Sequence, residues 1–211
     1  MAIKPILFST EMVRAILDWR KTCTRRIIKP QPTAHYGTQC VKPPYHPGDI
    51  LYVREKWCKY GKLSNLEQVI EGTEKYYYAA DGANPTPYNS FLVQRNGYDE
   101  YKDTPVWHPS IHMPKEAARI WLRVTDVRVE RLQKITDEQA KREGIQYDEC
   151  PTGFTWKQET DMHNCYTTPI GAMQALWNST IKKSDLYRYG WEANPYVFVI
   201  EFSKIDKPEE I

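Results

Sequence analysis

Residues 118–132 read ARIWLRVTDVRVERL, and this stretch carries the strongest strand signal of the chain. Apolar residues recur at every second position from Ile120 to Val124, as they do in a β-strand. The alternation resumes at Val127 with the opposite parity. An extra residue in a strand moves the following side chains to the other face. The change of parity near Thr125 and Asp126 therefore predicts a β-bulge or a sharp bend, as a strand of a small barrel needs.

The segments around this strand predict a mixture of helices and strands. Thr136 and Gln139 have the spacing of a helix capping box, and Gly144 is a good helix stop. Further helices are expected from Thr10 to Asp18 or Arg20 and over residues 169–177, and further strands over 50–53, 76–78 and 196–205. The last strand is apolar on both faces, so we expect it to be central or covered. These elements predict an α+β fold: a small β-barrel with helices packed on it, or alternatively an open sheet with helices on one face.

The composition is that of an ordinary globular protein. Of 211 residues, 41% are hydrophobic and 27% are charged, which suggests one domain with insertions or two small domains. The net charge of +2 does not by itself indicate a nucleic-acid binder, so local clusters of charge matter more. The sequence predicts neither a signal peptide nor a membrane span. Because the five cysteines also lack a CxxC spacing, we expect reduced thiols and a cytoplasmic location.

A zinc site could be assembled from His35, Cys40, His46 and Cys58. No pair among them has a recurring ligand spacing, so scattered core and surface residues are the favoured interpretation. We expect no metal and no other cofactor.

Residues 20–26 read RKTCTRR and place four cations around two hydroxyls and a thiol. A threonine hydroxyl needs a neighbouring base to become a nucleophile, and Lys21 could be that base if burial or adjacent positive charge removes its proton. Lys21 and Thr24 would share a face in a helical turn but not in a straight strand, so a catalytic interpretation requires a bend here. A solvated basic turn is the simpler alternative.

Glu143 falls at the C-terminal end of the helix that follows the central strand. The helix dipole disfavours a charged carboxylate there, which suits a proton donor. A solvated, fraying helix end is the simpler interpretation.

Aromatic residues are interspersed with basic ones along the chain, a pattern typical of surfaces on which single-stranded nucleic acids stack. Most of these rings are expected in the core. Trp156 and the run from Tyr76 to Tyr78 are expected at the surface.

Four segments in this order resemble the ASCH domain of the PUA-like superfamily, in the branch common among bacteriophage and prophage proteins. They are an apolar helix followed by RKTCTRR, then PGDILYVRE, then LRVTDVRVERL with TDEQAKREGI, and finally YVFVIEF, within residues 3–29, 47–57, 117–145 and 196–205. The resemblance implies a single domain over residues 1–211, with insertions at about 59–115 and 146–190. It also implies a small β-barrel whose cleft is bordered by the first helix and the basic loop after it.

One bacterial ASCH branch consists of the N(4)-acetylcytidine amidohydrolases, which remove acetyl from the modified nucleoside. Their motif is similar to Lys21, Thr24 and Glu143, and this implies a base, a nucleophile and a proton donor in that order. Trp19 stands where that branch usually has a small residue, and Arg25 adds a charge. Other ASCH and PUA-like domains bind RNA, or have been linked to cleaving it, without this activity.

Three hypotheses follow from these observations. The first is hydrolysis of the amide of an acylated cytidine-type base, with Arg26 orienting the ligand or stabilising the oxyanion. The second is a non-catalytic module that binds single-stranded RNA or DNA, with a modified base as a candidate target. Its phosphate contacts would be Arg20, Lys21, Arg25, Arg26 and Lys29. The third is contact with another protein through the two insertions. None of the three involves a membrane.

Overall fold

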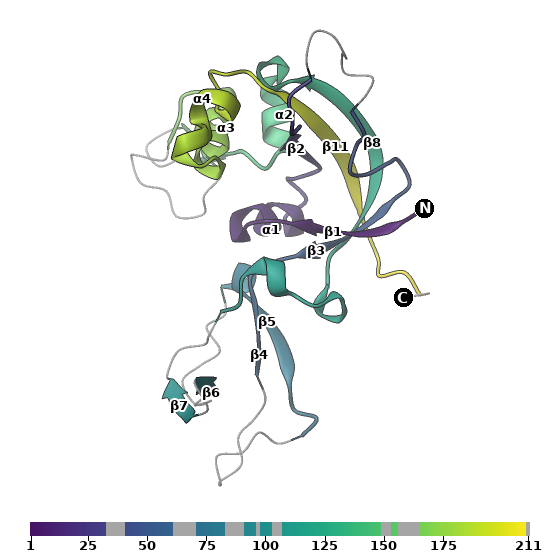
Figure 1. Ribbon diagram of the computed structural model, residues 1–211, viewed down its shortest axis with the longest axis vertical. Coiled ribbons are helices and arrows are strands. Elements are labelled where there is room, and N and C mark those ends of the chain that lie inside the picture. Colours follow the sequence, from purple (N-terminus) through teal and green to yellow (C-terminus); the bar gives the residue numbers. More distant parts are fainter. Residues whose placement is uncertain are drawn as a thin grey trace. The chain divides into compact units, whose positions relative to one another are not determined.

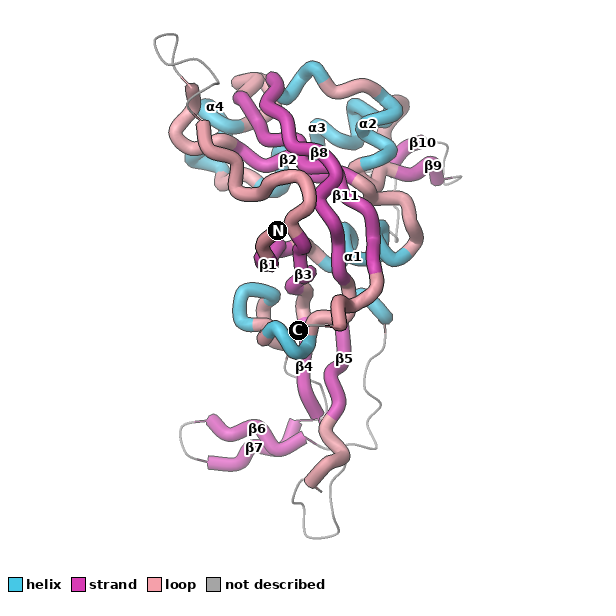
Figure 2. The backbone as a smooth tube through the Cα atoms, turned by 90° about the vertical axis from the view of Figure 1, so that its right-hand side faces the viewer, coloured by secondary structure: helices cyan, strands magenta, loops and turns pink. Residues whose placement is uncertain are grey.

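The two long strands β8 (Trp121–Arg131) and β11 (Tyr196–Ile205) run side by side through the whole of a strong bend (Figures 1 and 2). This computed structural model describes residues 1–32, 41–60, 71–82, 91–95, 98–102, 107–148, 153–155 and 165–209. The antiparallel register shifts between Glu201 and Phe202, where Asp126 and then Val124 are the partners. Thr125 is therefore the extra residue, and the predicted β-bulge is confirmed.

β8 and β11 belong to a five-stranded sheet with the order β1-β3-β8-β11-β2. The other strands are β1 (Ile3–Leu7), β2 (Cys23–Ile27) and β3 (Ile50–Arg54). β11 lies between β8 and β2, and its Val199 and Ile200, which point to opposite faces, are both fully buried. The expectation that the last strand is central is confirmed.

The fold is thus a mixed α+β arrangement built on this sheet. Within the described residues the sheet is open, since β1 and β2 are its edges and no closed barrel is formed. The segment expected as a basic loop after the first helix is in fact a strand from Cys23 onward, because it completes the ladder with β11.

The predicted helices are confirmed as α1 (Thr10–Leu17), α2 (Asp137–Arg142) and α3 (Pro169–Thr180), and a short α4 (Leu186–Tyr189) follows. Thr136 and Gln139 form both hydrogen bonds of the capping box at the start of α2. Gly144, just beyond the end of α2, has a φ of 106°, which explains the glycine at this position. No described helix is long and apolar enough to cross a membrane.

The chain divides into two compact units. One comprises residues 1–4, 15–51 and 120–211, and the other comprises residues 5–14 and 52–119, so the division passes through β1, α1 and β3. The single-domain interpretation with two insertions stays a prediction.

The second unit contains short antiparallel pairs of strands. β4 (Trp57–Tyr60) pairs with β5 (Lys75–Tyr78), which confirms the strand predicted at 76–78, and β6 (Phe91–Arg95) pairs with β7 (Tyr98–Lys102). Short 3-10 helices cover Ala79–Asp81, Ser110–His112 and Lys115–Ala117 in this unit, and Leu132–Lys134 and Lys183–Asp185 in the first unit.

The second unit also contains a buried carboxylate with a cationic partner. Glu55 is buried and accepts two hydrogen bonds from Arg119, at 3.0 and 3.1 Å.

Candidate functional site

The start of β2 meets the end of α2 through the backbone. Lys21 and Glu143 form an isolated antiparallel bridge, and the amide of Thr22 donates to the carbonyl of Arg142 at 2.9 Å. Two motif residues that lie 122 positions apart in the sequence are therefore adjacent in the first unit.

The side chains of these two residues form a direct ion pair. Nζ of Lys21 lies 2.6 Å from Oε2 of Glu143 and also donates to the Glu143 carbonyl at 2.8 Å. The side chains are 0% and 3% exposed, so the pair is closed to solvent. This rules out the simpler interpretation of Glu143 as a solvated, fraying helix end.

Arg25 extends the pair into a buried charge network. Its Nη1 lies 3.1 Å from the second carboxylate oxygen of Glu143, and its Nη2 donates to Glu130 and to the side-chain oxygen of Gln139, both at 2.8 Å. We use the term buried charge network for Lys21, Arg25, Glu130 and Glu143. It holds two cations and two carboxylates, so its formal charges cancel.

The network joins β2 to α2 and β8. The side-chain oxygen of Gln139 accepts two hydrogen bonds. One comes from Arg25, and the other comes from the backbone amide of Thr136 and closes the capping box. Each partner satisfies a group that would be costly to bury alone. Among the described residues, however, Nε of Arg25 has no hydrogen-bond partner.

Cys23 is buried against the same helix. Its Sγ lies 3.9 Å from the carbonyl of Gln139. Burial, followed by the negative charge of Glu143, raises the pKa of the Cys23 thiol to about 12. The thiol is therefore protonated at neutral pH and is a poor nucleophile.

Thr24 projects from the opposite face of β2. Cys23 and Arg25 both reach α2, and successive side chains of a strand point to alternate faces. Thr24 pairs with Ile200 of β11 and is only 2% exposed. The structure therefore brings Lys21 and Glu143 together, and the described contacts of this pair do not include Thr24.

The predicted ligand-binding cations differ in their surroundings. Arg25 forms ion pairs with Glu130 and Glu143 inside the buried charge network, and its side chain is 0% exposed. Arg26 lies on the same face as Thr24, and burial lowers the pKa of its guanidinium. Lys29 is exposed, with Nζ 4.6 Å from the ring centroid of Tyr189.

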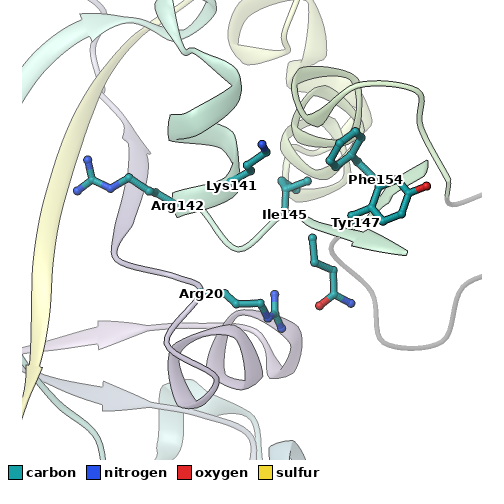
Figure 3. Close-up of a pocket in the computed structure, with 7 residues that line it drawn as sticks. Arg20, Lys141, Arg142, Ile145, Tyr147 and Phe154 are labelled. Atoms are coloured by element: carbon teal, nitrogen blue, oxygen red, sulfur yellow. The ribbon is translucent and has the colours of Figure 1, made fainter. Parts of the chain in front are cut away.

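Arg20 lines a pocket of about 500 Å³ in the first unit (Figure 3). We call this the Arg20 pocket; its lining residues are Arg20, Lys141, Arg142, Ile145, Gln146, Tyr147 and Phe154. They come from the segment before β2, the end of α2, β9 (Gln146–Asp148) and β10 (Gly153–Thr155). β9 and β10 pair antiparallel, which places Tyr147 opposite Phe154.

The two rings and the cations occupy different parts of the Arg20 pocket. Figure 3 shows Tyr147 and Phe154 together on one side, with Arg20 and Lys141 at separate places on the other side. The ring centroids are 5.4 Å apart in an edge-to-face arrangement. Nζ of Lys141 lies 6.0 Å from the ring centroid of Phe154.

Arg142 contributes to the pocket without presenting its charge there. Its guanidinium is directed away from the two rings (Figure 3), toward Glu201, which it meets at 2.6 Å. Arg128 also pairs with Glu201 at 2.6 Å. Burial alone would raise the pKa of Glu201, but the hydrogen bonds from Arg142 and Arg128 outweigh it and lower the pKa.

Sequence reasoning identified Arg20 but missed Lys141, Tyr147 and Phe154. These three lie at the end of α2 and in a stretch that the family resemblance left uninterpreted. The pairing of β9 with β10 creates the aromatic wall, and only the aromatic and basic residues near 141–154 could have indicated it.

Two sequence-based expectations lie partly outside the described residues. His35 and Cys40 of the candidate zinc site are not described, and neither is Trp156. Among the residues that are described, no group of three or more His, Cys, Asp or Glu could hold a metal ion.

No family model matches the chain, and comparisons with curated proteins and with solved structures found no significant match.

Proposed function

We propose that this chain binds a nucleoside or a single-stranded nucleic acid as an ASCH-type protein of the PUA-like superfamily, without hydrolysing its ligand. The sequence resemblance assigns Lys21 and Glu143 to one site, and the contact of 2.6 Å between Lys21 Nζ and Glu143 Oε2 supports that assignment. The observation that favours binding without hydrolysis is the placement of Thr24 on the opposite face of β2 from Cys23 and Arg25.

The proposed fold is a PUA-like β-barrel, of which the described five-stranded sheet would form the wall. The strong curvature of β8 and β11 (Figure 1) and the β-bulge at Thr125 support this, because a sheet must bend to close. That the sheet closes into a barrel is part of the proposal.

Binding is favoured over hydrolysis by the state of the three motif residues. Lys21 Nζ contacts the carboxylate and the carbonyl of Glu143 at 2.6 and 2.8 Å, whereas a general base must lie within hydrogen-bond reach of the proton it takes. Thr24 projects from the other face of β2, away from the base that would activate it. A nucleophile and its base must lie within hydrogen-bond reach of each other.

A second candidate function is hydrolysis of the amide of an acylated cytidine-type base, and the same contact between Lys21 and Glu143 favours it. Thr24 Oγ1 would attack the amide carbonyl, Lys21 would take the hydroxyl proton, and Glu143 would protonate the leaving amine. Water would then hydrolyse the acyl-threonine ester to release the acid. This route requires the ion pair to open and Thr24 to reach the same side.

Incubation of the purified protein with N(4)-acetylcytidine, monitored for cytidine, separates the two functions. We expect no cytidine, and in parallel we expect binding of a labelled short oligouridylate in an anisotropy titration. Turnover that is lost in both Lys21→Ala and Thr24→Ala would establish the hydrolase instead. The two variants must show the far-UV circular dichroism spectrum of the wild-type protein for that conclusion.

A further inference from the structure

The Arg20 pocket has an aromatic wall on an apolar floor. Ile145 is 2% exposed and lies among the lining residues, whereas Tyr147 is 58% exposed. A ring that leaves so much of its surface in water, beside a second ring in edge-to-face contact, offers a face on which a planar group can stack. Stacking of this kind tolerates any nucleobase, because every base has a π-face.

Two cationic groups flank this wall. Among the described residues Lys141 has no ion pair, and its nearest ring partner is Phe154. Arg20 donates from Nη1 to the Gly144 carbonyl at 2.7 Å and from Nη2 to Asp18 at 3.0 Å. These bonds fix the guanidinium and use two of its five N–H donors.

The charges around the pocket favour an anionic ligand. Asp18 pairs with Arg20, and Glu201 is shared between Arg142 and Arg128. Lys141 interacts electrostatically with the exposed Glu138 but forms no ion pair with any described residue, so its ammonium group is open to an anion. A guanidinium with rigid donors is suited to phosphate, and the ammonium group of Lys141, elsewhere on the pocket, adds a second, flexible cation.

The size of the pocket limits what it can hold. A volume of about 500 Å³ falls within the range of roughly 300–1,000 Å³ of small-molecule sites. This accommodates one nucleotide but not a stretch of strand.

We infer that the Arg20 pocket binds a single nucleotide unit, with its base stacked on the exposed ring of Tyr147 and its phosphate attracted by the cations Arg20 and Lys141. The unit is either a free nucleoside monophosphate or the phosphorylated end of a single strand, since both present the same chemistry. This inference rests on the proposed function for its ligand class, but the site lies outside the buried charge network.

Calorimetry of the wild-type protein with the four ribonucleoside monophosphates, cytidine and inorganic phosphate tests whether the base and the phosphate both contribute to binding. A monophosphate should bind more tightly than either cytidine or inorganic phosphate alone, since it engages both parts of the pocket. Tyr147→Ala should weaken this binding at least about fivefold, as loss of a stacked base requires. Tyr187→Ala, which removes a 79% exposed tyrosine outside the pocket, should leave it unchanged.

The contribution of Lys141 to phosphate binding is tested by calorimetry at several salt concentrations. Lys141→Ala should weaken binding of the monophosphate and reduce the slope of log affinity against log salt by about one. Lys183→Ala, at an exposed lysine outside the pocket, is the matched control and should not change the slope.

Anisotropy titrations with a labelled oligouridylate, with and without a 5′-phosphate, identify the source of the nucleotide. Tighter binding of the phosphorylated strand supports the pocket and assigns it to strand ends. Binding of monophosphates that neither strand displaces supports the pocket and assigns it to free nucleotides.

Two results overturn the inference, and they are distinguishable. If Tyr147→Ala and Lys141→Ala bind every probe as the wild-type protein does, the pocket is not the site, while the proposed function stands. If the wild-type protein binds no monophosphate, nucleoside or strand, both the inference and the proposed function fail.

Discussion

In the buried charge network the side chains of Lys21, Arg25 and Glu143 are at most 3% exposed, and Glu130 is 14% exposed. The buried charges are stable there because of their partners. Taking a charge out of water costs several kcal/mol, and only close opposite charges and hydrogen bonds offset that cost. Glu143 is the central member, since it accepts from Lys21 at 2.6 Å and from Arg25 at 3.1 Å. Removal of its charge leaves both cations without their shared partner.

Glu143→Gln should therefore lower the free energy of unfolding by about 3–5 kcal/mol, the typical cost of breaking a buried ion pair by removing one partner. Urea denaturation followed by circular dichroism measures this difference. Glu138→Gln removes an exposed charge from the same helix and should lower the free energy of unfolding much less. Equal losses in the two variants would contradict the account of the network.

The Cys23 thiol should resist alkylation in the folded protein. Its pKa of about 12, raised first by burial and then by Glu143, leaves almost no thiolate at mildly alkaline pH. Peptide mapping by mass spectrometry after treatment with iodoacetamide should find Cys23 unmodified in buffer and modified in concentrated urea. Modification at equal rates in both conditions would show that the thiol is accessible.

The residues of this region illustrate what a sequence can and cannot predict. The spacing of Lys21 and Thr24 allowed either a shared face or opposite faces, and only the ladder of β2 with β11 decides between them. The contact of Lys21 with Glu143 spans 122 positions, so no local pattern could predict it. The expectation that the two residues share a site came from the family resemblance and stays a prediction.

At the scale of the elements, α2 is positioned by the glycine that ends it. Gly144 has a φ of 106°, and a Cβ added there would lie 2.8 Å from Cβ of Ala15. The left-handed conformation and the close approach both exclude a larger residue. The loop from α2 can then return past Lys21, which brings Glu143 to its partner.

Gly144→Ala should cost more stability than Gly48→Ala. Both residues have positive φ values, but a Cβ on Gly48 would meet no atom within 4 Å. The Gly48 variant should lose about 1–3 kcal/mol from backbone strain alone, and the Gly144 variant should lose more because of the clash with Ala15. Thermal and urea denaturation of the two variants measure the difference; a smaller loss for Gly144→Ala would contradict the packing described.

The turn before β3 is held by Asp49, which contacts the N-terminal residues. Its carboxylate accepts from Lys4 Nζ at 2.9 Å and from the backbone amides of Ala2 and His46 at 2.8 and 3.1 Å. The hydrogen bond from Lys4 is the main cause that lowers the pKa of Asp49 from 3.8 to about 2. The folded protein thus holds this proton less tightly than the unfolded chain.

Asp49→Asn should lower the free energy of unfolding by about 1.5–3 kcal/mol at neutral pH, through loss of charged hydrogen bonds. Because the folded pKa is the lower one, the stabilisation is present above about pH 3.8 and is lost as the pH falls toward about 2. The difference between the wild-type protein and the variant should therefore narrow over that interval. A difference that is constant across it would contradict the assignment.

Elements with a strong local signal were predictable, and those defined by pairing were not. The parity change at Thr125, the capping box at Thr136 and the apolar run of β11 all lie in the sequence itself. β2 was not predicted because its residues, CTRRI, have no apolar alternation. Its strand conformation comes from hydrogen bonds to β11, a segment more than 160 residues away in the chain.

At the scale of the whole molecule, the described residues form a mixed α+β structure divided into two compact units. Both parts of the candidate functional region, the buried charge network and the Arg20 pocket, belong to the first unit. Neighbouring residues connect them, since Arg20 precedes Lys21 and Arg142 precedes Glu143. A buried charge network next to a pocket with two cations and two aromatic rings fits the proposed binding of a nucleotide better than activation of a threonine.

Binding of a nucleoside or a single-stranded nucleic acid is the function proposed for the whole molecule. The most direct measurement is the affinity of the wild-type protein for a nucleoside monophosphate and for a labelled oligouridylate over a series of salt concentrations. We expect saturable binding of at least one of these probes, and this binding should weaken as salt rises, in proportion to the phosphates contacted. Absence of binding of both probes at low salt, or binding that does not change with salt, would contradict the proposal.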